Sequence, residues 1–144
     1  GEEVMVHNTD AALEAACAAT GAEALNYTAA PVYAGDRTRG RHKWLIEFAT
    51  PPASLNTFAR ILDEALQKVN SDYQAKRAGG IFLDPLSVTV ASEGLFDRWL
   101  ATTGKLGGQR KVPRLANNRR FIDPLLQLNG PVAYSDTTTP NQQN

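Results

Sequence analysis

His42-Lys-Trp-Leu-Ile-Glu-Phe48 is the clearest strand pattern in the chain. Two alternating sets of side chains point to its opposite faces: His42, Trp44, Ile46 and Phe48 on one face, and Lys43, Leu45 and Glu47 on the other. A second alternating stretch spans 24–34, and the polar, glycine-bounded turn 35–40 joins the two. The pattern therefore predicts an antiparallel hairpin at the centre of the fold.

Segments with helical apolar periodicity, and residues typical of helix ends, precede and follow this hairpin in the sequence. Before it, 2–6 resembles a short strand, and Asn8 or Thr9 is expected to cap a helix that Gly21 ends. After it, Pro51-Pro52 breaks the chain and Ser54 caps a helix whose apolar stripe reaches Val69.

Shorter elements complete the chain. We expect a short helix in 70–77, a strand at 86–90, a helix over 95–102, a loop, and a last helix over 119–128 with Pro124 in its first turns. The order is β-α-β-β-α-β-α-loop-α. It predicts an α+β domain, a small antiparallel sheet covered by helices on one side.

Composition limits the classes of function. The 144 residues, 42% hydrophobic, suffice for one domain with a real core. Cys17 is the single cysteine and the two histidines are far apart, so neither a disulfide nor a metal centre is expected. There is no signal peptide and no apolar run of about 18 residues, so we expect a cytoplasmic protein outside the membrane.

A basic segment follows the predicted helix over 95–102. Between Gly104 and Ile122 there are six basic residues and no acidic one, while the rest of the chain holds 9 basic and 15 acidic residues. Three glycines and Pro113 predict a loop here, carrying Lys105, Arg110, Lys111 and Arg114. Such a loop suits contact with an anion, and a merely solvated charged loop is the alternative.

Other residue types offer little chemistry by themselves. His42 shares the apolar face of Trp44, which favours a half-buried, hydrogen-bonded histidine over a catalytic one. Cys17 lies on the apolar face of an alanine-rich helix and is expected to pack. Asp72, Tyr73, Lys76 and Arg77 are expected to form an exposed polar cluster, and packing of Tyr73 on Arg77 at helical spacing is the alternative. The Walker pattern is absent.

Four motifs stand out along the chain: Gly104-Lys-Leu-Gly-Gly-Gln-Arg-Lys-Val-Pro-Arg-Leu-Ala-Asn117, Asn26-Tyr-Thr-Ala-Ala-Pro-Val-Tyr33, Arg41-His-Lys-Trp-Leu-Ile-Glu-Phe48, and 66–77 with its Asn-Ser-Asp-Tyr-x-Ala-Lys-Arg core. They resemble motifs of one known family, the Gretchen Hagen auxin-responsive family of acyl acid amido synthetases, and of its bacterial type. The likeness runs from about Gly1 to Leu126.

The resemblance implies a function. These enzymes use ATP and Mg²⁺ to make an acyl-adenylate and pass the acyl group to an amino acid amine. A small C-terminal domain closes over an active site in a large N-terminal domain, so the chain looks like that small domain. Lys111 is then expected to contact the α-phosphate, with Lys105 as second candidate and Arg110 and Arg114 in support.

The resemblance also implies boundaries and partners. Residues 1–128 would form the mobile lid domain. The resemblance does not cover 129–144, whose many Thr, Asn, Gln and Pro residues predict a polar, flexible tail. The partners would be the N-terminal adenylation domain, a carboxylic acid and an amino acid, and the fragment alone would be inactive. Two alternatives stay open: a stand-alone small-molecule-binding regulatory module, and an RNA- or anion-binding module, which the zero net charge disfavours.

Overall fold

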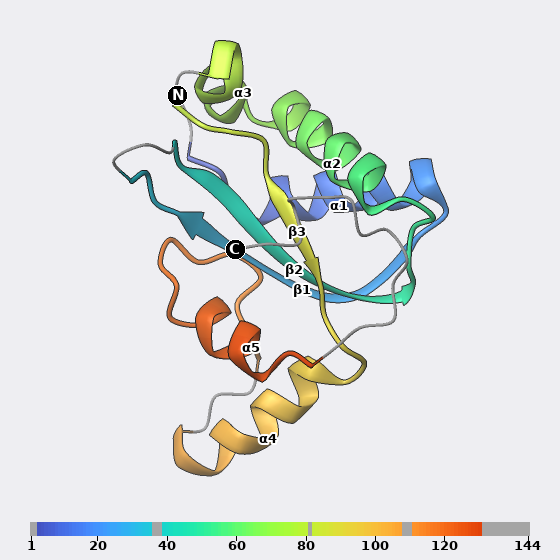
Figure 1. Cartoon of the computed structure of the whole chain (residues 1–144), viewed down its shortest axis with the longest axis vertical. Helices are drawn as coiled ribbons and strands as arrows, with labels where there is room; N and C mark the ends of the chain where they lie inside the picture. Colours follow the sequence, from blue (N-terminus) through green and yellow to red (C-terminus); the bar gives the residue numbers. More distant parts are fainter. Residues whose placement is uncertain (1–2, 36–38, 81, 108–110, 131–144) are drawn as a thin grey trace.

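The computed structural model describes residues 3–35, 39–80, 82–107 and 111–130, with the backbone alone described for 104–107. Its elements are α1 (Val6–Thr20), β1 (Glu23–Val32), β2 (Arg41–Thr50), α2 (Leu55–Val69), α3 (Ser71–Arg77), the 3-10 turn η1 (Ala78–Gly80), β3 (Ser87–Val90), α4 (Leu95–Gly107) and α5 (Ile122–Leu128). Figure 1 shows how they surround one sheet. The α+β class is confirmed, as is the order of elements from the first helix onward.

The sheet is mixed, with the order β1-β2-β3. β1 and β2 form the predicted antiparallel hairpin, in which Ala29 lies opposite Trp44. β3 runs parallel to β2, with Trp44 beside Val88, so the prediction of an antiparallel sheet is wrong for this strand. The reason is the crossover: α2 and α3 carry the chain back across the sheet before β3 begins.

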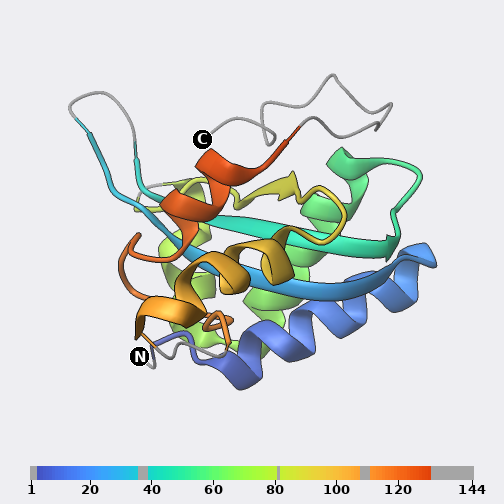
Figure 2. The ribbon, with the colours of Figure 1, turned by 90° about the horizontal axis from the view of Figure 1, so that it is seen from below.

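Helices cover both faces of the sheet, and the prediction of one covered face is also wrong. Trp44 and Ile46 of β2 belong to the core that α1 and α2 complete, whereas Leu45 belongs to a second core with Leu95 of α4 and Ile122 of α5. In Figure 2, α1 and α5 accordingly lie on opposite sides of the sheet. The period-two pattern of β2 thus separates two apolar cores.

The N-terminal strand expected at 2–6 does not form in the described part of that range. Glu3–Met5 belong to no strand, and Val6 begins α1. The cause is local: the Asn8 side chain accepts a hydrogen bond from the Met5 N–H at 2.9 Å, so the helix starts earlier than the expected cap. Asn8 and Thr9 themselves are buried in its first turn.

Several predicted helix ends are confirmed. Gly21 stops α1 in the left-handed conformation with φ +77°, and the Ser54 hydroxyl accepts a hydrogen bond from the Thr57 N–H to cap α2. Pro124 lies in the first turn of α5, where its missing N–H costs no helical hydrogen bond. Asn129 follows α5, and its side chain bonds Ser92 N and Val90 O, so the predicted tail begins at an anchored residue. The range 131–144 lies outside the described residues.

Candidate functional site

The predicted basic loop is in part a helix. α4 extends through Gly107, so the loop predicted for 104–107 is wrong and the backbone of Lys105 is helical. The Thr102 and Thr103 hydroxyls both donate to the Trp99 carbonyl, at 2.7 and 3.2 Å, which is compatible with a continuing helix. The Lys105 side chain and the whole of Arg110 lie outside the described residues.

The rest of the segment, residues 111–117, lies along the outer edge of β1, and we call it the basic strip. Ala29 donates its N–H to the Arg114 carbonyl at 2.9 Å, and Ala116 donates to the Ala29 carbonyl at 3.0 Å. Leu115 therefore forms a parallel bridge with Ala29. The strip extends the sheet by a short edge segment.

Side chains of Thr28 in β1 and of Tyr33, the residue after β1, hold the basic strip. The Thr28 hydroxyl donates to the Pro113 carbonyl at 2.7 Å, and the Tyr33 hydroxyl donates to the Asn117 carbonyl at 2.7 Å. Pro113 suits this edge position because it has no N–H that would need a partner. The strip therefore has a fixed register on the sheet.

The two described candidate residues differ in their surroundings. The Arg114 guanidinium bonds the Asp10 carboxylate of α1 at 2.6 Å, so its charge is already paired. Lys111 is exposed at the start of the strip and lines a hollow of about 630 Å³ together with Asp10 and Asp97. Lys111 is thus presented at the surface by a segment whose following residues are anchored.

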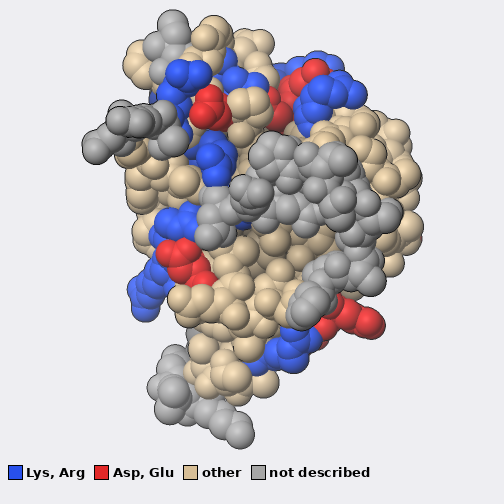
Figure 3. Space-filling view, in the orientation of Figure 1, with Lys and Arg blue, Asp and Glu red and all other residues tan. Residues whose placement is uncertain are grey.

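The remaining basic residues of the segment contact their own neighbourhood. Arg119 bonds the Asp123 carboxylate at 2.6 Å and the Pro31 carbonyl at 2.9 Å. The Arg120 guanidinium lies 5.6 Å from the centre of the Phe121 ring. Figure 3 shows acidic side chains next to basic ones on the face drawn, without a broad patch of one sign.

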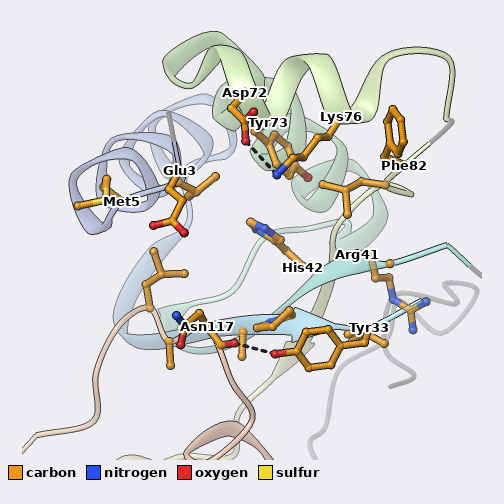
Figure 4. Close-up of a pocket in the computed structure, with 18 of the residues that line it drawn as sticks. Glu3, Met5, Tyr33, Arg41, His42, Asp72, Tyr73, Lys76, Phe82 and Asn117 are labelled. Atoms are coloured by element: carbon orange, nitrogen blue, oxygen red, sulfur yellow. Dashed lines mark hydrogen bonds and ion pairs between the residues drawn. The ribbon is translucent and has the colours of Figure 1, made fainter. Parts of the chain in front are cut away.

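A larger hollow of about 750 Å³, here called the His42 cleft, lies at the other end of the strip. Its lining comes from segments far apart in the sequence, with the His42 ring near its centre and Tyr73, Lys76 and Phe82 across from the sheet (Figure 4). Leu115, Ala116 and Asn117 of the basic strip form part of one wall. The sequence did not predict this cleft.

His42 is a neutral group at physiological pH. Burial, above all, lowers the pKa of its imidazole to about 4, against the opposing attraction of Asp63. Its ring centre lies 5.0 Å from that of Tyr73, and its Nδ1 is buried without a hydrogen-bond partner. The half-buried position was predicted, but the expected hydrogen bonding is absent for Nδ1.

A buried ion pair fixes Tyr73 behind His42. The Tyr73 hydroxyl donates to Asp63 at 2.5 Å, and Arg77 Nη2 donates to the same carboxylate at 2.9 Å. The expectation of an exposed cluster is therefore wrong for Tyr73, which is buried, and for Arg77, whose side chain is 15% exposed. Their partner Asp63 comes from α2, which spacing within 70–77 could not indicate.

Lys43 is the other unusual charge of the sheet. Its side chain is fully buried on the face opposite to His42, and its pKa falls to about 7, mainly through desolvation and further through Arg41 and Arg119.

Among the described residues, no three histidine, cysteine or acidic side chains gather as a metal site. No described helix has the length and apolarity to span a membrane.

Comparisons with known proteins agree with this fold. The chain resembles a solved structure described as AtGH3.15 acyl acid amido synthetase in complex with 2,4-DB, with a TM-score of 0.71 and 14% identity over 90% of this chain and 25% of that one. It also resembles a GH3.15 acyl acid amido synthetase, with a TM-score of 0.69 and 17% identity over 89% of this chain and 25% of that one. The chain thus spans about a quarter of the length of these enzymes.

A search of curated protein sequences gives no significant match. A family model, described as the GH3 family C-terminal domain, matches residues 7–120. That range includes His42, Lys111 and the entire basic strip. The chain belongs to the GH3 family, and residues 7–120 are its C-terminal domain.

Proposed function

We propose that this chain is the mobile C-terminal domain of an ATP-dependent acyl acid amido synthetase. In the first reaction a carboxylate oxygen of the acyl acid bonds the α-phosphorus of ATP, and pyrophosphate leaves. In the second, an amino acid amine bonds the acyl carbon, a proton leaves the nitrogen, and AMP departs. Family membership and the fold of the GH3.15 structures support this proposal.

The single observation that carries the proposal is the placement of Lys111. Lys111 is exposed and stands at the head of a strip whose backbone is bonded to β1. A cation fixed on a rigid domain reaches the α-phosphate only when that domain closes, where it offsets the charge that builds as pyrophosphate leaves. Lys105 and Arg110 remain further candidates, and Arg114 acts through its pair with Asp10.

The described residues fit a phosphate contact but not a magnesium site. Lys111 supplies a point charge of the kind that binds phosphate. Among the described residues no three histidine, cysteine or acidic side chains gather as a metal site. By the resemblance to the family, the ligands of Mg²⁺ and the acyl pocket would lie in the large domain. When bound, Mg²⁺ would supply charge neutralisation for the departing pyrophosphate.

Lys111→Ala in the full polypeptide that carries this domain tests the proposal. We expect acyl-adenylate formation, followed as pyrophosphate exchange, to fall at least about 100-fold, as for the loss of one transition-state contact. Arg120→Ala is the matched control, because Arg120 is also exposed and lies on the same segment. A Lys111→Ala rate within threefold of the control would overturn the role of Lys111.

A separate measurement tests the enzyme itself. An immunoblot of the source cell against this domain should reveal a polypeptide several times heavier than 15.6 kDa. The purified 144-residue chain should form no acyl-adenylate from ATP and a carboxylic acid. A native band near 15.6 kDa would contradict the proposal.

A stand-alone ligand-binding module is the second candidate. The His42 cleft favours it, since about 750 Å³ lies in the range of small-molecule sites. This candidate requires a native chain of this size that binds a ligand tightly without another domain. The interspersed charges of Figure 3 give no support to an RNA-binding surface, which would bind with steep salt dependence.

A further inference from the structure

Asp10 of α1 joins the basic strip to the interior of the domain. Its Oδ2 accepts a hydrogen bond from Arg114 Nη1 at 2.6 Å, and its Oδ1 accepts one from the Tyr27 hydroxyl, also at 2.6 Å. Arg114 follows Lys111 closely in the strip, whereas Tyr27 is a buried residue of β1. One carboxylate therefore connects the surface segment that carries Lys111 with the core.

Tyr27 gives this carboxylate a fixed support. The residue is 6% exposed, its ring stacks on the buried Trp44 ring with 5.1 Å between the ring centres, and its hydroxyl lies 2.7 Å from the Thr9 hydroxyl. Burial, and then the hydrogen bond to Asp10, raises the pKa of Tyr27, so the hydroxyl keeps its proton and remains a donor. Asp10 is thus held from inside the fold, independently of Arg114.

This support distinguishes the pair of Asp10 and Arg114 from an ordinary surface ion pair. Their side chains are 38% and 56% exposed, and pairs with such exposure usually contribute little, because two flexible side chains have to be ordered together. Here the carboxylate is already ordered, since Tyr27 binds its other oxygen. The entropic cost of the pair therefore falls mainly on Arg114.

Side-chain contacts on two sides hold the residues that follow Lys111. Val112 packs against the core that α4 and α5 cover, and Arg114 bonds Asp10 of α1. The hydrogen bonds that join the strip to β1 engage Pro113 and later residues. Loss of the Asp10 carboxylate would release the α1 side of this segment and leave the other contacts in place.

We infer that Asp10 is a positioning residue for Lys111 in the proposed adenylation reaction. It holds the α1 side of the strip through Arg114, and Tyr27 holds Asp10. The carboxylate contacts no substrate, and its effect reaches the reaction only through the orientation of Lys111. The inference rests on the proposed function, because Lys111 needs a phosphate to act on.

Asp10→Asn in the full polypeptide tests the inference, with Asp97→Asn as matched control. Asp97 of α4 is also an acid that lines the hollow beside Lys111, but it takes part in none of the ion pairs found among the described residues. We expect Asp10→Asn to lower kcat for pyrophosphate exchange about tenfold, through misplacement of the cation, with KM for ATP unchanged. Asp97→Asn should stay within about twofold of wild type, because solvent screens an exposed charge.

The same substitution in the Lys111→Ala polypeptide separates positioning from a merely structural role. Without the Lys111 cation there is nothing left to position, so Asp10→Asn should change the remaining rate by less than about twofold. A loss of stability alone would lower the rate by the same factor in both backgrounds.

Tyr27→Phe tests the support of the carboxylate. Phenylalanine keeps the ring that stacks on Trp44 and leaves the Asp10 charge in place, but it removes the hydroxyl donor. We expect kcat to fall in the same direction as for Asp10→Asn, again only when Lys111 is present. An unchanged kcat would show that Tyr27 does not hold Asp10 in the working enzyme.

Deuterium uptake in peptides covering 111–117 gives a readout that does not depend on catalysis. It should rise in Asp10→Asn and stay at the wild-type level in Asp97→Asn. Equal kcat for these two variants, or an equal loss with and without Lys111, would overturn the inference. A wild-type polypeptide that forms no acyl-adenylate would refute the proposed function, and a rise in uptake confined to Asp10→Asn would then still show that Asp10 holds the strip.

Discussion

Replacing Asp63 by alanine should be among the most destabilising single changes in the domain. The carboxylate is buried and accepts hydrogen bonds from Arg77 Nη2 at 2.9 Å, from the Tyr73 hydroxyl at 2.5 Å and from the Leu86 N–H at 3.2 Å. Alanine would leave a cation, a phenol and an amide without their partner. Removing one member of a buried ion pair costs about 3 to 5 kcal/mol.

Urea denaturation of the 144-residue chain measures this effect. In thermal denaturation, the same loss of 3 to 5 kcal/mol in the free energy of unfolding corresponds to a fall in Tm on the order of 10 °C for a chain of this size. Glu64→Ala is the matched control, because Glu64 is the next residue of α2 and makes an exposed pair with Arg60 at 3.4 Å. That change should cost less than about 1 kcal/mol.

The same carboxylate predicts a pH dependence. Burial alone would raise the pKa of Asp63, but hydrogen bonds from Arg77, Tyr73 and Leu86 outweigh it, so the pKa is lowered. An acid with a lowered folded-state pKa stabilises the protein above its unfolded pKa of about 3.9, and the contribution is lost as the pH falls through the folded value. Wild type should therefore lose stability below about pH 4 more steeply than Asp63→Ala. A cost for Asp63→Ala within 1 kcal/mol of Glu64→Ala would refute the reasoning.

Three further changes test other parts of the fold. The folded pKa of Lys43 is about 7, whereas the unfolded chain keeps this proton until about pH 10.4, so the free energy of unfolding of the wild type should rise between about pH 7 and pH 10. Lys43→Met should abolish this rise. Equal slopes of the unfolding free energy against pH for variant and wild type would contradict the prediction. Thr28→Val removes the hydrogen bond to the Pro113 carbonyl and should cost about 1 kcal/mol. It should also speed amide exchange at Ala116, and unchanged exchange would show that the strip is held otherwise. Gly21→Ala should cost about 1 kcal/mol in urea denaturation through backbone strain alone, because φ is +77° and a Cβ there meets no atom within 4 Å.

The hairpin and the helix ends could be predicted because their causes are local. Alternation along 42–48 fixes which side chains share a face, and Ser54 and Gly21 act on their own helices. The direction of β3 had a usable signal, since a strand reached through a helical crossover runs parallel to its neighbour. The covering of both faces had a signal too, because Leu45 on the second face of β2 needs its own apolar partners.

Charge and composition were the only features of the sequence from which the candidate site could be predicted. They single out Lys111 and Arg114, but Arg114 pairs with Asp10, which lies 104 residues away in the sequence. The His42 cleft joins the N-terminal residues, both strands of the hairpin, α3 and the basic strip. No short motif in the sequence indicates that these segments lie together, so the cleft can be recognised only when the sheet register is known.

The sheet register is also what makes a rigid lid physically reasonable. In the proposed function, Lys111 would have to reach one phosphate oxygen to within hydrogen-bond distance, which a freely moving loop would achieve only at a high entropic cost. The structure lowers that cost after Lys111, because the Pro113 and Arg114 carbonyls accept hydrogen bonds from β1 and the Asn117 carbonyl accepts one from Tyr33, the residue after β1. β1 in turn is bonded along its length to β2, whose centre is buried on both faces. A rotation of the whole domain, as the proposed function requires, would therefore carry the start of the strip with it as one body, and the direction of Lys111 would depend on the orientation of the domain rather than on the folding of the segment.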